Sequence, residues 1–372
     1  MKKVIFPTIL MVFAFIAISA NLKTAPSDLT AGFTYGNPEI KSINSLSFGP
    51  EGILFIGDSK NAAIYALDTQ DKTNKSSSEE VRIEGFDEKI AASLGTTPDN
   101  VEISDMAVNP ISKTVYFSIH LTDGTPVLLK LTGEKLENVS LKEVSHSKIS
   151  LENPIGENVK DKWDRPQRVW AISDLKYHNG KVLVSGLSNK EFASTFRSIP
   201  FPFNESQSST SLEVWHAAHG QYETHAPIKT FDVISIDNKE YLMASYTCTP
   251  LVLFPMEDLK DGTHNKGRTV AELGSGNSPL DMISYKKDGK KYFLMSNNNR
   301  PVMRIDYGDI ANFKDSITET VEEFAVATGV AYDNLPFPYV LQMDLLDENQ
   351  VLYVQRTSNG DLLLRSRSTK WM

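Results

Sequence analysis

Cysteine is almost absent from this chain of 372 residues, which contains Cys248 alone. A chain with a single cysteine forms no internal disulfide, so its fold depends on packing and hydrogen bonds. Basic residues are also scarce, because 38 Lys and Arg stand against 47 Asp and Glu and no basic run occurs. An acidic chain of this kind is not expected to bind nucleic acid, since binding to the phosphate backbone depends on clustered Lys and Arg.

Long apolar runs are missing beyond the N-terminus. The longest run covers residues 9–18, after Lys2 and Lys3 and just before Ser19 and Ala20. This order is typical of a secretory signal peptide, here residues 1–20, and ten apolar residues are too few for an easy membrane span. The alternative is an uncleaved anchor. The sequence predicts export to a periplasm or the exterior, with no stable membrane insertion after signal removal.

Several cofactor and nucleophile motifs are also absent. The chain has no CxxCH haem site, no P-loop, no GxSxG elbow and no GxGxxG fingerprint. These motifs carry haem attachment, phosphate binding, serine nucleophiles and dinucleotide binding. We therefore expect no haem, nucleotide or flavin.

What the chain does have is a repeated β-hairpin. In residues 279–295 two β-prone runs flank a charged turn that contains Asp288 and Gly289, and such a pattern predicts a hairpin. The unit occurs six times, and the predicted first strands contain these residues: Leu46, Met106, Leu175, Val233, Met282 and Met343. Regular repetition of small sheets is the pattern of a β-propeller, in which packing around an axis buries each sheet.

The sequence therefore predicts an all-β fold, a six-bladed β-propeller with four-stranded antiparallel blades. Its single domain covers residues 33–366, and the sixth unit closes the ring. Residues 21–32 are expected to form a leader or a closing strand, and residues 367–372 a C-terminal tail. Short helices are expected at residues 88–94 and within residues 309–328. The chain is predicted to be a monomer.

The hairpins and the signal peptide resemble the exported six-bladed propellers of the NHL-repeat, YWTD-like and gluconolactonase-like group. The resemblance covers residues 33–366 and rests on this pattern. It implies that each first strand lines the central channel and begins at the face where ligands bind. Gluconolactonase-like enzymes hold a divalent ion with Glu, Asn and Asp at the channel mouth, and the resemblance implies such roles for Asp58, Asp174, Asn189 and Asp281.

One register of polar residues lies at or just before the first strands. Its members are Asn44, Asp105, Asp174, Asp232, Asp281 and Gln342. By the resemblance, these side chains surround one channel. We predict a cation site formed by Asp105, Asp174, Asp232 and Asp281, with Ca²⁺ as the best-suited ion because all ligands are oxygens. The alternative is that each Asp bonds nearby backbone N–H groups and acts only in folding.

A second register lies mainly where the second strands end, over the same face. Its candidate ligand-binding residues are Asp58, His120, Asn189, His225, Asn297, Arg300 and Arg356. Such a mixture suits a small polar ligand, anionic or polyhydroxy, or a protein partner. Solvated loop ends are the alternative. The leading hypothesis is an exported propeller that binds this ligand or partner at the channel face; the alternatives are a divalent-metal-dependent, lactonase-like hydrolase and a scaffold without a small-molecule site.

A group of histidines and the single cysteine remains. His216, His219, His225 and Cys248 have the nitrogen and sulfur atoms that zinc and copper prefer. A spacing of three, however, places His216 and His219 on opposite sides of a strand. Three roles are open for Cys248: a small buried residue, a metal ligand or a nucleophile.

Overall fold

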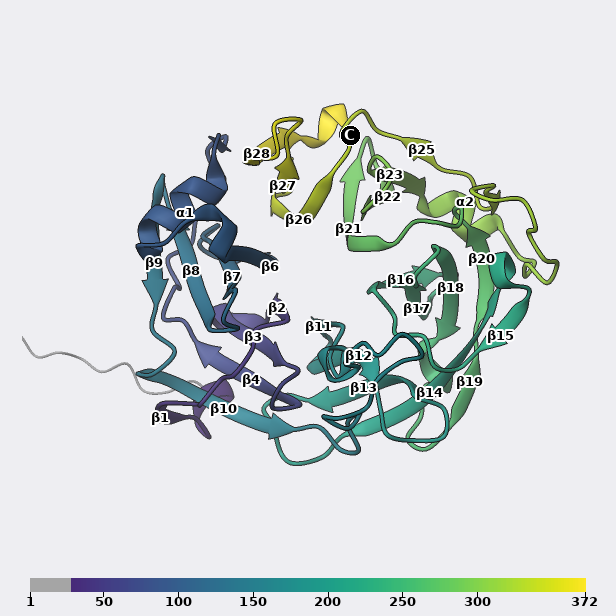
Figure 1. The fold of residues 1–372 in the computed structure, drawn as a ribbon, viewed down its shortest axis with the longest axis horizontal. Helices are drawn as coiled ribbons and strands as arrows, with labels where there is room; N and C mark the ends of the chain where they lie inside the picture. Colours follow the sequence, from purple (N-terminus) through teal and green to yellow (C-terminus); the bar gives the residue numbers. More distant parts are fainter. Residues whose placement is uncertain (1–27) are drawn as a thin grey trace, which may run out of the picture.

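The computed structural model describes residues 28–372 and shows a six-bladed all-β propeller (Figure 1). The predicted fold class is confirmed, and all six residues chosen to mark the first strands lie on first strands. The predicted signal peptide, residues 1–20, lies outside the described residues. No helix among residues 28–372 has the length and apolarity needed to cross a membrane.

We number the blades by the position of their first strands in the chain. Blade 1 contains β2 (Ser45–Phe48), β3 (Ile53–Asp58), β4 (Ala63–Asp68), β10 (Val144–Ser150) and the edge strand β1 (Thr34–Gly36). Blade 2 contains β6 (Val101–Val108), β7 (Val115–Leu121), β8 (Pro126–Thr132) and β9 (Lys135–Val139). Blade 3 contains β11 (Asp174–His178), β12 (Lys181–Leu187), β13 (Ser194–Pro200), β14 (Ser208–His216), β15 (Gln221–Glu223) and β19 (His264–Lys266).

The other three blades follow the same plan. Blade 4 contains β16 (Thr230–Ile236), β17 (Lys239–Ser245), β18 (Pro250–Pro255), β20 (Arg268–Glu272) and β24 (Thr328–Gly329). Blade 5 contains β21 (Pro279–Lys287), β22 (Lys290–Asn297), β23 (Met303–Asp306) and β25 (Asp333–Asn334). Blade 6 contains β26 (Val340–Asp347), β27 (Gln350–Arg356), β28 (Leu362–Ser368) and β5 (Arg82–Ile83). The two α-helices among the described residues are α1 (Phe86–Leu94) and α2 (Tyr307–Asn312).

Tight turns close the inner hairpins. In blade 5 the turn residues Asp288 and Gly289 both have positive φ, 50° and 77°, between the paired residues Lys287 and Lys290. Two successive left-handed residues are the signature of a type I′ turn, whose twist matches that of the strands. The Asp-Gly step that predicted this hairpin therefore forms its turn.

The blades do not follow one another around the ring in chain order. The first strands contact each other in the cyclic order β2, β6, β26, β21, β16, β11 and back to β2. Blade 1 thus lies between blades 2 and 3, and blade 2 lies between blades 1 and 6, as Figure 1 shows. The sixth unit completes the ring, but its neighbours are blades 5 and 2 and not blade 1.

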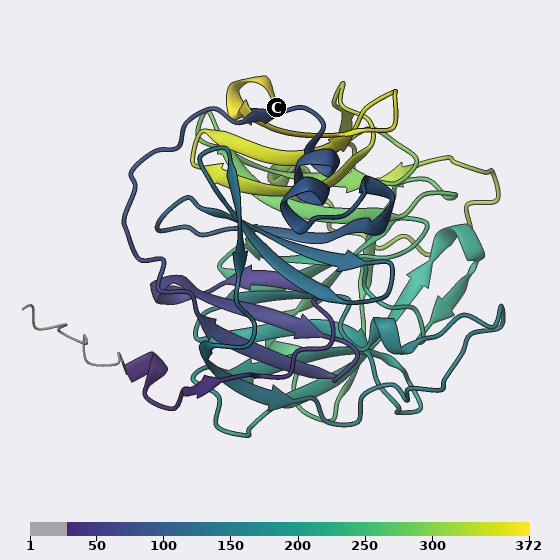
Figure 2. The ribbon, with the colours of Figure 1, turned by 60° about the vertical axis from the view of Figure 1, so that its left-hand side comes forward.

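Two outer strands explain this order. After blade 1 the chain runs along the outside to blade 6, where β5 pairs with β28, and only then forms blade 2 (Figure 2). It next returns to blade 1, where β10 pairs with β4, before it enters blade 3. Each of these strands completes a blade whose other strands lie elsewhere in the chain.

The apolar core lies between neighbouring blades rather than at one centre. Phe55 of blade 1 packs with Leu175 of blade 3, and Phe117 of blade 2 packs with Leu352 of blade 6. Because each sheet buries its faces against its neighbours, this packing holds blade 1 in its unexpected place.

Candidate functional site

Five aspartates on first strands form a ring around the axis. Each turns one oxygen, Oδ1, back to accept the N–H of the next residue, at 2.7–2.9 Å. The five residues are Asp105, Asp174, Asp232, Asp281 and Asp344. This local bond orients each carboxyl so that Oδ2 points to another blade.

The second oxygen, Oδ2, links each blade to the next. Asp105 accepts the Leu46 N–H at 2.6 Å, Asp174 the Phe231 N–H at 3.0 Å, and Asp281 the Met343 N–H at 2.7 Å. Asp344 accepts the Val108 N–H at 2.7 Å, Asp232 accepts the Ser284 hydroxyl, and Ser47 of blade 1 takes the sixth place by accepting the Tyr177 N–H at 3.2 Å. All six blade interfaces thus have one such bond.

Blade 6 contributes Asp344 to this ring, not Gln342 as the register predicted. Gln342 instead donates its amide to the Ser104 carbonyl at 3.0 Å. Two kinds of bond alternate around the ring. Asp105, Asp174 and Asp281 accept an N–H near the start of the neighbouring first strand. Ser47, Asp232 and Asp344 accept from a residue further along it. A register that assumes six equivalent blades therefore selects the wrong residue in blade 6.

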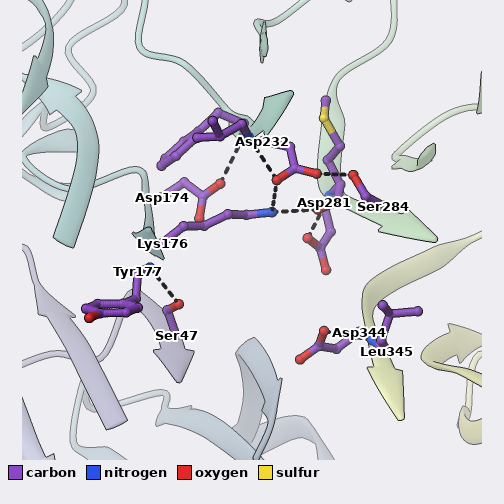
Figure 3. A network of polar contacts seen from close by, with 12 residues as sticks. Ser47, Asp174, Lys176, Tyr177, Asp232, Asp281, Ser284, Asp344 and Leu345 are labelled. Carbon is purple, nitrogen blue, oxygen red and sulfur yellow. Dashed lines mark hydrogen bonds and ion pairs between the residues drawn. The ribbon is translucent and has the colours of Figure 1, made fainter. Parts of the chain in front are cut away.

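Lys176 brings a positive charge into this ring. Its ammonium group donates to the Met282 carbonyl at 3.1 Å and lies 3.6 Å from Oδ1 of Asp232 (Figure 3). Lys176 lies two residues after Asp174 on β11, so both side chains point to the same side of the strand. About 28% of the Lys176 side-chain surface remains accessible from the cavity beside it.

Burial and neighbouring charges shift the pKa values in the ring. Burial raises the pKa of Asp281 to about 7 and that of Asp344 to about 6. It also raises the pKa of Asp105 well above its usual range, with Asp281 adding to the effect. Burial alone lowers the pKa of Lys176, but Asp232 and Asp174 outweigh it and raise that pKa. Lys176 is therefore charged at neutral pH, whereas Asp281 and Asp344 titrate near it.

A cavity of about 410 Å³ lies on the axis beside the ring. Asp105, Asp174, Lys176, Asp281 and Asp344 line it. It extends to the turns that follow first strands, where its lining includes Lys113, Asp347 and Glu348. The cavity therefore reaches the end of the channel where the first strands finish, opposite the face expected from the resemblance. Asp232 lines an adjoining cavity with Ser284 and Tyr307.

Six of the seven residues of the second register lie in blades 1, 2, 3, 5 and 6, and His225 lies in the connection between blades 3 and 4. Within residues 28–372 they are not hydrogen-bonded to one another. Asp58 and Asn297 are buried. Asp58 accepts the Lys41 N–H and the Ser42 hydroxyl from the segment before β2, and Asn297 donates to the carbonyls of Met295 and Pro301. His120 accepts the Ile43 N–H at 3.0 Å and contacts the Ser104 hydroxyl at 2.8 Å, so it joins blades 1 and 2.

The remaining members of this register lie nearer to solvent. Arg300 donates to the Ser275 carbonyl at 3.0 Å, and Arg356 donates to the Gly360 carbonyl at 2.8 Å. Asn189 and His225 are exposed, and the His225 ring contacts the Thr224 hydroxyl at 2.8 Å. None of the seven side chains lines the axial cavity, and their role in ligand binding stays a prediction.

His216 and His219, in contrast, lie side by side. Their ring centroids are 3.8 Å apart, because β14 ends at His216 and a 3₁₀ turn, η5 (Ala217–His219), follows. With three residues per turn, the first and fourth residues of such a turn overlie one another. The prediction that the two rings face opposite sides of a strand is therefore wrong.

Glu223 on β15 holds both imidazoles. Its two oxygens lie 3.0 Å from Nδ1 of His216 and 2.6 Å from Nδ1 of His219. Cys248 reaches the same place from the turn between β17 and β18 of blade 4. This turn holds Cys248 and Thr249 at φ of 63° and 62°, in the left-handed region that non-glycine residues rarely occupy.

The ionisable groups of this cluster influence one another. Burial opposes charge on His216, but its hydrogen bond with Cys248 and the one that Glu223 accepts from it raise its pKa to about 9. The hydrogen bond to His216 lowers the pKa of Cys248. Burial opposes charge on Glu223 too, yet the two histidines bring its pKa down to about 2, whereas burial raises the pKa of Glu272 to about 7.

One group of His, Cys, Asp or Glu ligand atoms in residues 28–372 is compact enough for a metal ion. His216, His219 and Cys248 each place a ligand atom within 4.8 Å of the other two. The four aspartates predicted to bind Ca²⁺ do not form such a group, and whether a cation binds beside them stays a prediction.

Sequence reasoning missed Lys176, Asp344, Glu223 as a partner of both histidines, and Glu272. The sequence could have indicated Lys176. Alternate residues of a strand share a face, and Asp174, two residues earlier, was already predicted to face the channel. Glu223 reaches His216 through the short β14–β15 hairpin, whereas Glu272 comes from β20, which is distant in the chain, and no local pattern shows its approach.

Comparison with known proteins gives no family: no protein-family model matches this chain, and no curated protein matches it. The grouping with NHL-repeat, YWTD-like or gluconolactonase-like propellers therefore stays a prediction.

Solved structures are similar to the chain at low identity. The extracellular domains 1–2 of Drosophila Semaphorin 1b match with 9% identity over 90% of this chain and 86% of that chain, at a TM-score of 0.38. A glucose dehydrogenase-type oxidoreductase from Thermus thermophilus matches with 10% identity over 90% and 100%, at a TM-score of 0.32. An endo-arabinanase from Bacillus licheniformis matches with 14% identity over 73% and 94%, at a TM-score of 0.37. Likenesses this distant say nothing about function.

Proposed function

We propose that this protein is an exported propeller that binds a small polar ligand with a cationic group in its axial cavity. The observation that supports this is the cavity of about 410 Å³ beside the aspartate ring. Cavities of a few hundred Å³ with convergent polar groups and shifted pKa values are preferred sites for small ligands.

The charge of the lining favours a cationic ligand. Six acidic and two basic side chains face the cavity: Asp105, Asp174, Asp281, Asp344, Asp347, Glu348, Lys113 and Lys176. The ring carboxyls each bind two backbone or hydroxyl donors, and Asp174 binds a third, the Ser45 hydroxyl at 3.4 Å, which leaves further lone pairs for an ammonium or hydroxyl group of a ligand. Glu348, in the turn after β26, is placed to meet the ligand at the entrance.

The alternative is a hydrolase whose divalent ion is held by Asp105, Asp174, Asp232 and Asp281. Such an ion needs several oxygens around one point. The ring carboxyls instead turn toward the backbone of neighbouring blades and toward Lys176. This geometry favours an organic cation over a metal ion in the cavity.

The test uses the purified full chain and the diamine putrescine as a probe, with the neutral polyol mannitol as its control. We expect calorimetric titration to show binding of putrescine and not of mannitol. Glu348→Gln should weaken the binding about five-fold, because it removes one charge at the entrance, whereas Glu143→Gln on an exposed loop should not. Absence of binding at millimolar putrescine, or equal affinity of the Glu348 variant and the parent, contradicts the proposal.

Export is part of this proposal and rests on Lys2, Lys3 and the apolar run of residues 9–18. We expect N-terminal sequencing of the protein from its natural source to begin near Asn21. Protein that retains Met1 in the soluble cytoplasmic fraction contradicts export without affecting the cavity.

A further inference from the structure

A second site, separate from the axial cavity, lies where blade 3 meets blade 4. Blade 3 provides His216 and His219 at the end of β14 and in η5, and blade 4 provides Cys248 from a tight turn. The turn is fixed by two backbone hydrogen bonds, from Cys248 to the Asn277 carbonyl at 2.7 Å and from Thr249 to the Tyr246 carbonyl at 2.9 Å. The thiol therefore has a defined position beside the imidazoles.

Glu223 determines which imidazole nitrogens are free. Because its two oxygens engage Nδ1 of both His216 and His219, each ring has only Nε2 left for a further partner. A carboxylate that binds the far nitrogen of an imidazole is the usual support of a metal-ligating histidine, since it fixes the ring and its tautomer. Here one carboxylate does this for two rings.

Two buried atoms of the cluster have no nitrogen or oxygen partner. Nε2 of His216 is one of them: the side chain is only 2% exposed, and the Cys248 thiol beside this ring is only a weak hydrogen-bond donor. The other is Oε1 of Glu272, a residue with 0% exposure whose Oε2 accepts the Ala218 N–H at 3.4 Å. Leaving such groups unpaired costs roughly 1–3 kcal/mol each, so their persistence points to a ligand.

We propose that His216, His219 and Cys248 bind one thiophilic transition-metal ion, Zn²⁺ or Cu⁺, through the two Nε2 atoms and the sulfur. Ligands of tetrahedral zinc, with bonds of about 2.0–2.3 Å, lie roughly 3.3–3.8 Å apart. One ring nitrogen of each histidine and the Cys248 sulfur already lie within 4.8 Å of one another, so side-chain rotations can complete the site. Two imidazoles and a thiolate suit zinc and copper, and not Ca²⁺ or Mg²⁺.

The same residues also resemble a Cys–His–Glu triad, with Cys248 as a nucleophile. A triad uses one imidazole between its carboxylate and its nucleophile. In this protein Glu223 orients two imidazoles, and His219 has no role in proton transfer to Cys248. The second oriented histidine therefore favours a metal ion.

The test uses the full chain, freed of metal with a chelator and titrated with Zn²⁺, with Co²⁺ as a spectroscopic substitute, and anaerobically with Cu⁺. We expect one equivalent of metal and a sulfur-to-cobalt charge-transfer band. Cys248→Ser should abolish this band. His219→Ala, at a side chain that is 45% exposed and so tolerant of change, should weaken Zn²⁺ binding about 100-fold, and Glu223→Gln about 10-fold or more.

His225→Ala is the matched control, because His225 is an exposed histidine of the same segment, and it should bind metal as the parent does. Bound Zn²⁺ should also protect Cys248 from alkylation by iodoacetamide. Equal Zn²⁺ affinity of the His219 variant and the parent, or alkylation of Cys248 unaffected by Zn²⁺, overturns the metal site and leaves the nucleophile in its place. Comparison of the Zn²⁺ and Cu⁺ affinities identifies the preferred ion.

Discussion

Lys176 places an ammonium group among carboxyls from four blades. The charges that raise its pKa against the effect of burial come from Asp232, Asp174, Asp281 and Asp344. Each of these carboxyls also binds a neighbouring blade, so the charge balance at Lys176 is coupled to the packing of the ring. A buried charge that loses its partner is costly, whereas a complete pair is close to neutral in free energy.

Lys176→Met should lower the free energy of unfolding by about 3 kcal/mol at pH 7, because Asp174 and Asp232 then lose their nearest cation. The loss should be smaller at pH 5, where more of the ring carboxyls are protonated. Urea denaturation measures both values. Lys286→Met, at an exposed position on the first strand of blade 5, is the control and should change stability by less than about 0.5 kcal/mol. Equal losses for the two variants contradict the role of Lys176.

The raised pKa values of Asp281 and Asp344 predict a falling stability with rising pH. An unfolded Asp has a pKa of about 3.9, whereas the folded values are about 7 and about 6. Between pH 4 and pH 7 the folded state therefore binds more protons, and unfolding becomes easier as the pH rises through this window. Thermal unfolding in buffers free of divalent cations should show this slope, and Asp281→Asn should flatten it. If the free energy of unfolding instead rises from pH 5 to pH 7, equally in the parent and in Asp281→Asn, the raised pKa values are contradicted.

The sequence predicted four members of the aspartate ring and, as an alternative role, their bonds to nearby backbone N–H groups, but not the bonds that join the blades. Asp105, Asp174, Asp232 and Asp281 precede equivalent first-strand residues, so a repeat register was sufficient to group them. Asp344 and Ser47 instead follow the first-strand residues Met343 and Leu46, and they were not in the register; what places them in the ring is their bonding to Val108 and Tyr177 of other blades. Local patterns say nothing about such contacts.

The outer strands β5 and β10 decide the ring order. β5 has two residues, Arg82 and Ile83, and pairs with the outer edge of β28. The loop of residues 69–80 before it is long and polar, so the sequence showed a connection but not its destination. The inner hairpins were predictable from alternation and turn residues, whereas an edge strand this short has no periodicity to read.

The pairing of β5 with blade 6 predicts a disulfide between engineered cysteines. In a Cys248→Ser background, Arg82→Cys with Arg365→Cys should form a bond under mild oxidation, because these residues are direct partners across antiparallel strands. Arg82→Cys with Lys148→Cys, on β10 of blade 1, should not. Non-reducing electrophoresis after proteolysis between blades identifies the linked peptides. A bond in the second pair instead of the first would return β5 to blade 1 and contradict the ring order.

Blades 1 and 2 have exchanged places in the ring, yet the molecule keeps a single central channel. Six first strands still surround one channel, since each hydrophobic layer needs only a neighbouring sheet and not a particular one. The hydrogen bonds of the ring then cross each interface once, which makes the channel wall one continuous structure. A cavity with such a wall is held open by the fold, so a ligand need not form it on binding.

The central claim is that a small cationic ligand occupies this axial cavity. Its most direct test is a crystal structure of the full chain grown with putrescine. We predict electron density for the diamine beside the ring, with one ammonium group near Asp281 or Asp344 and the other toward Glu348. A well-ordered structure at saturating putrescine with the diamine bound elsewhere, or with only water in the cavity, would contradict the claim.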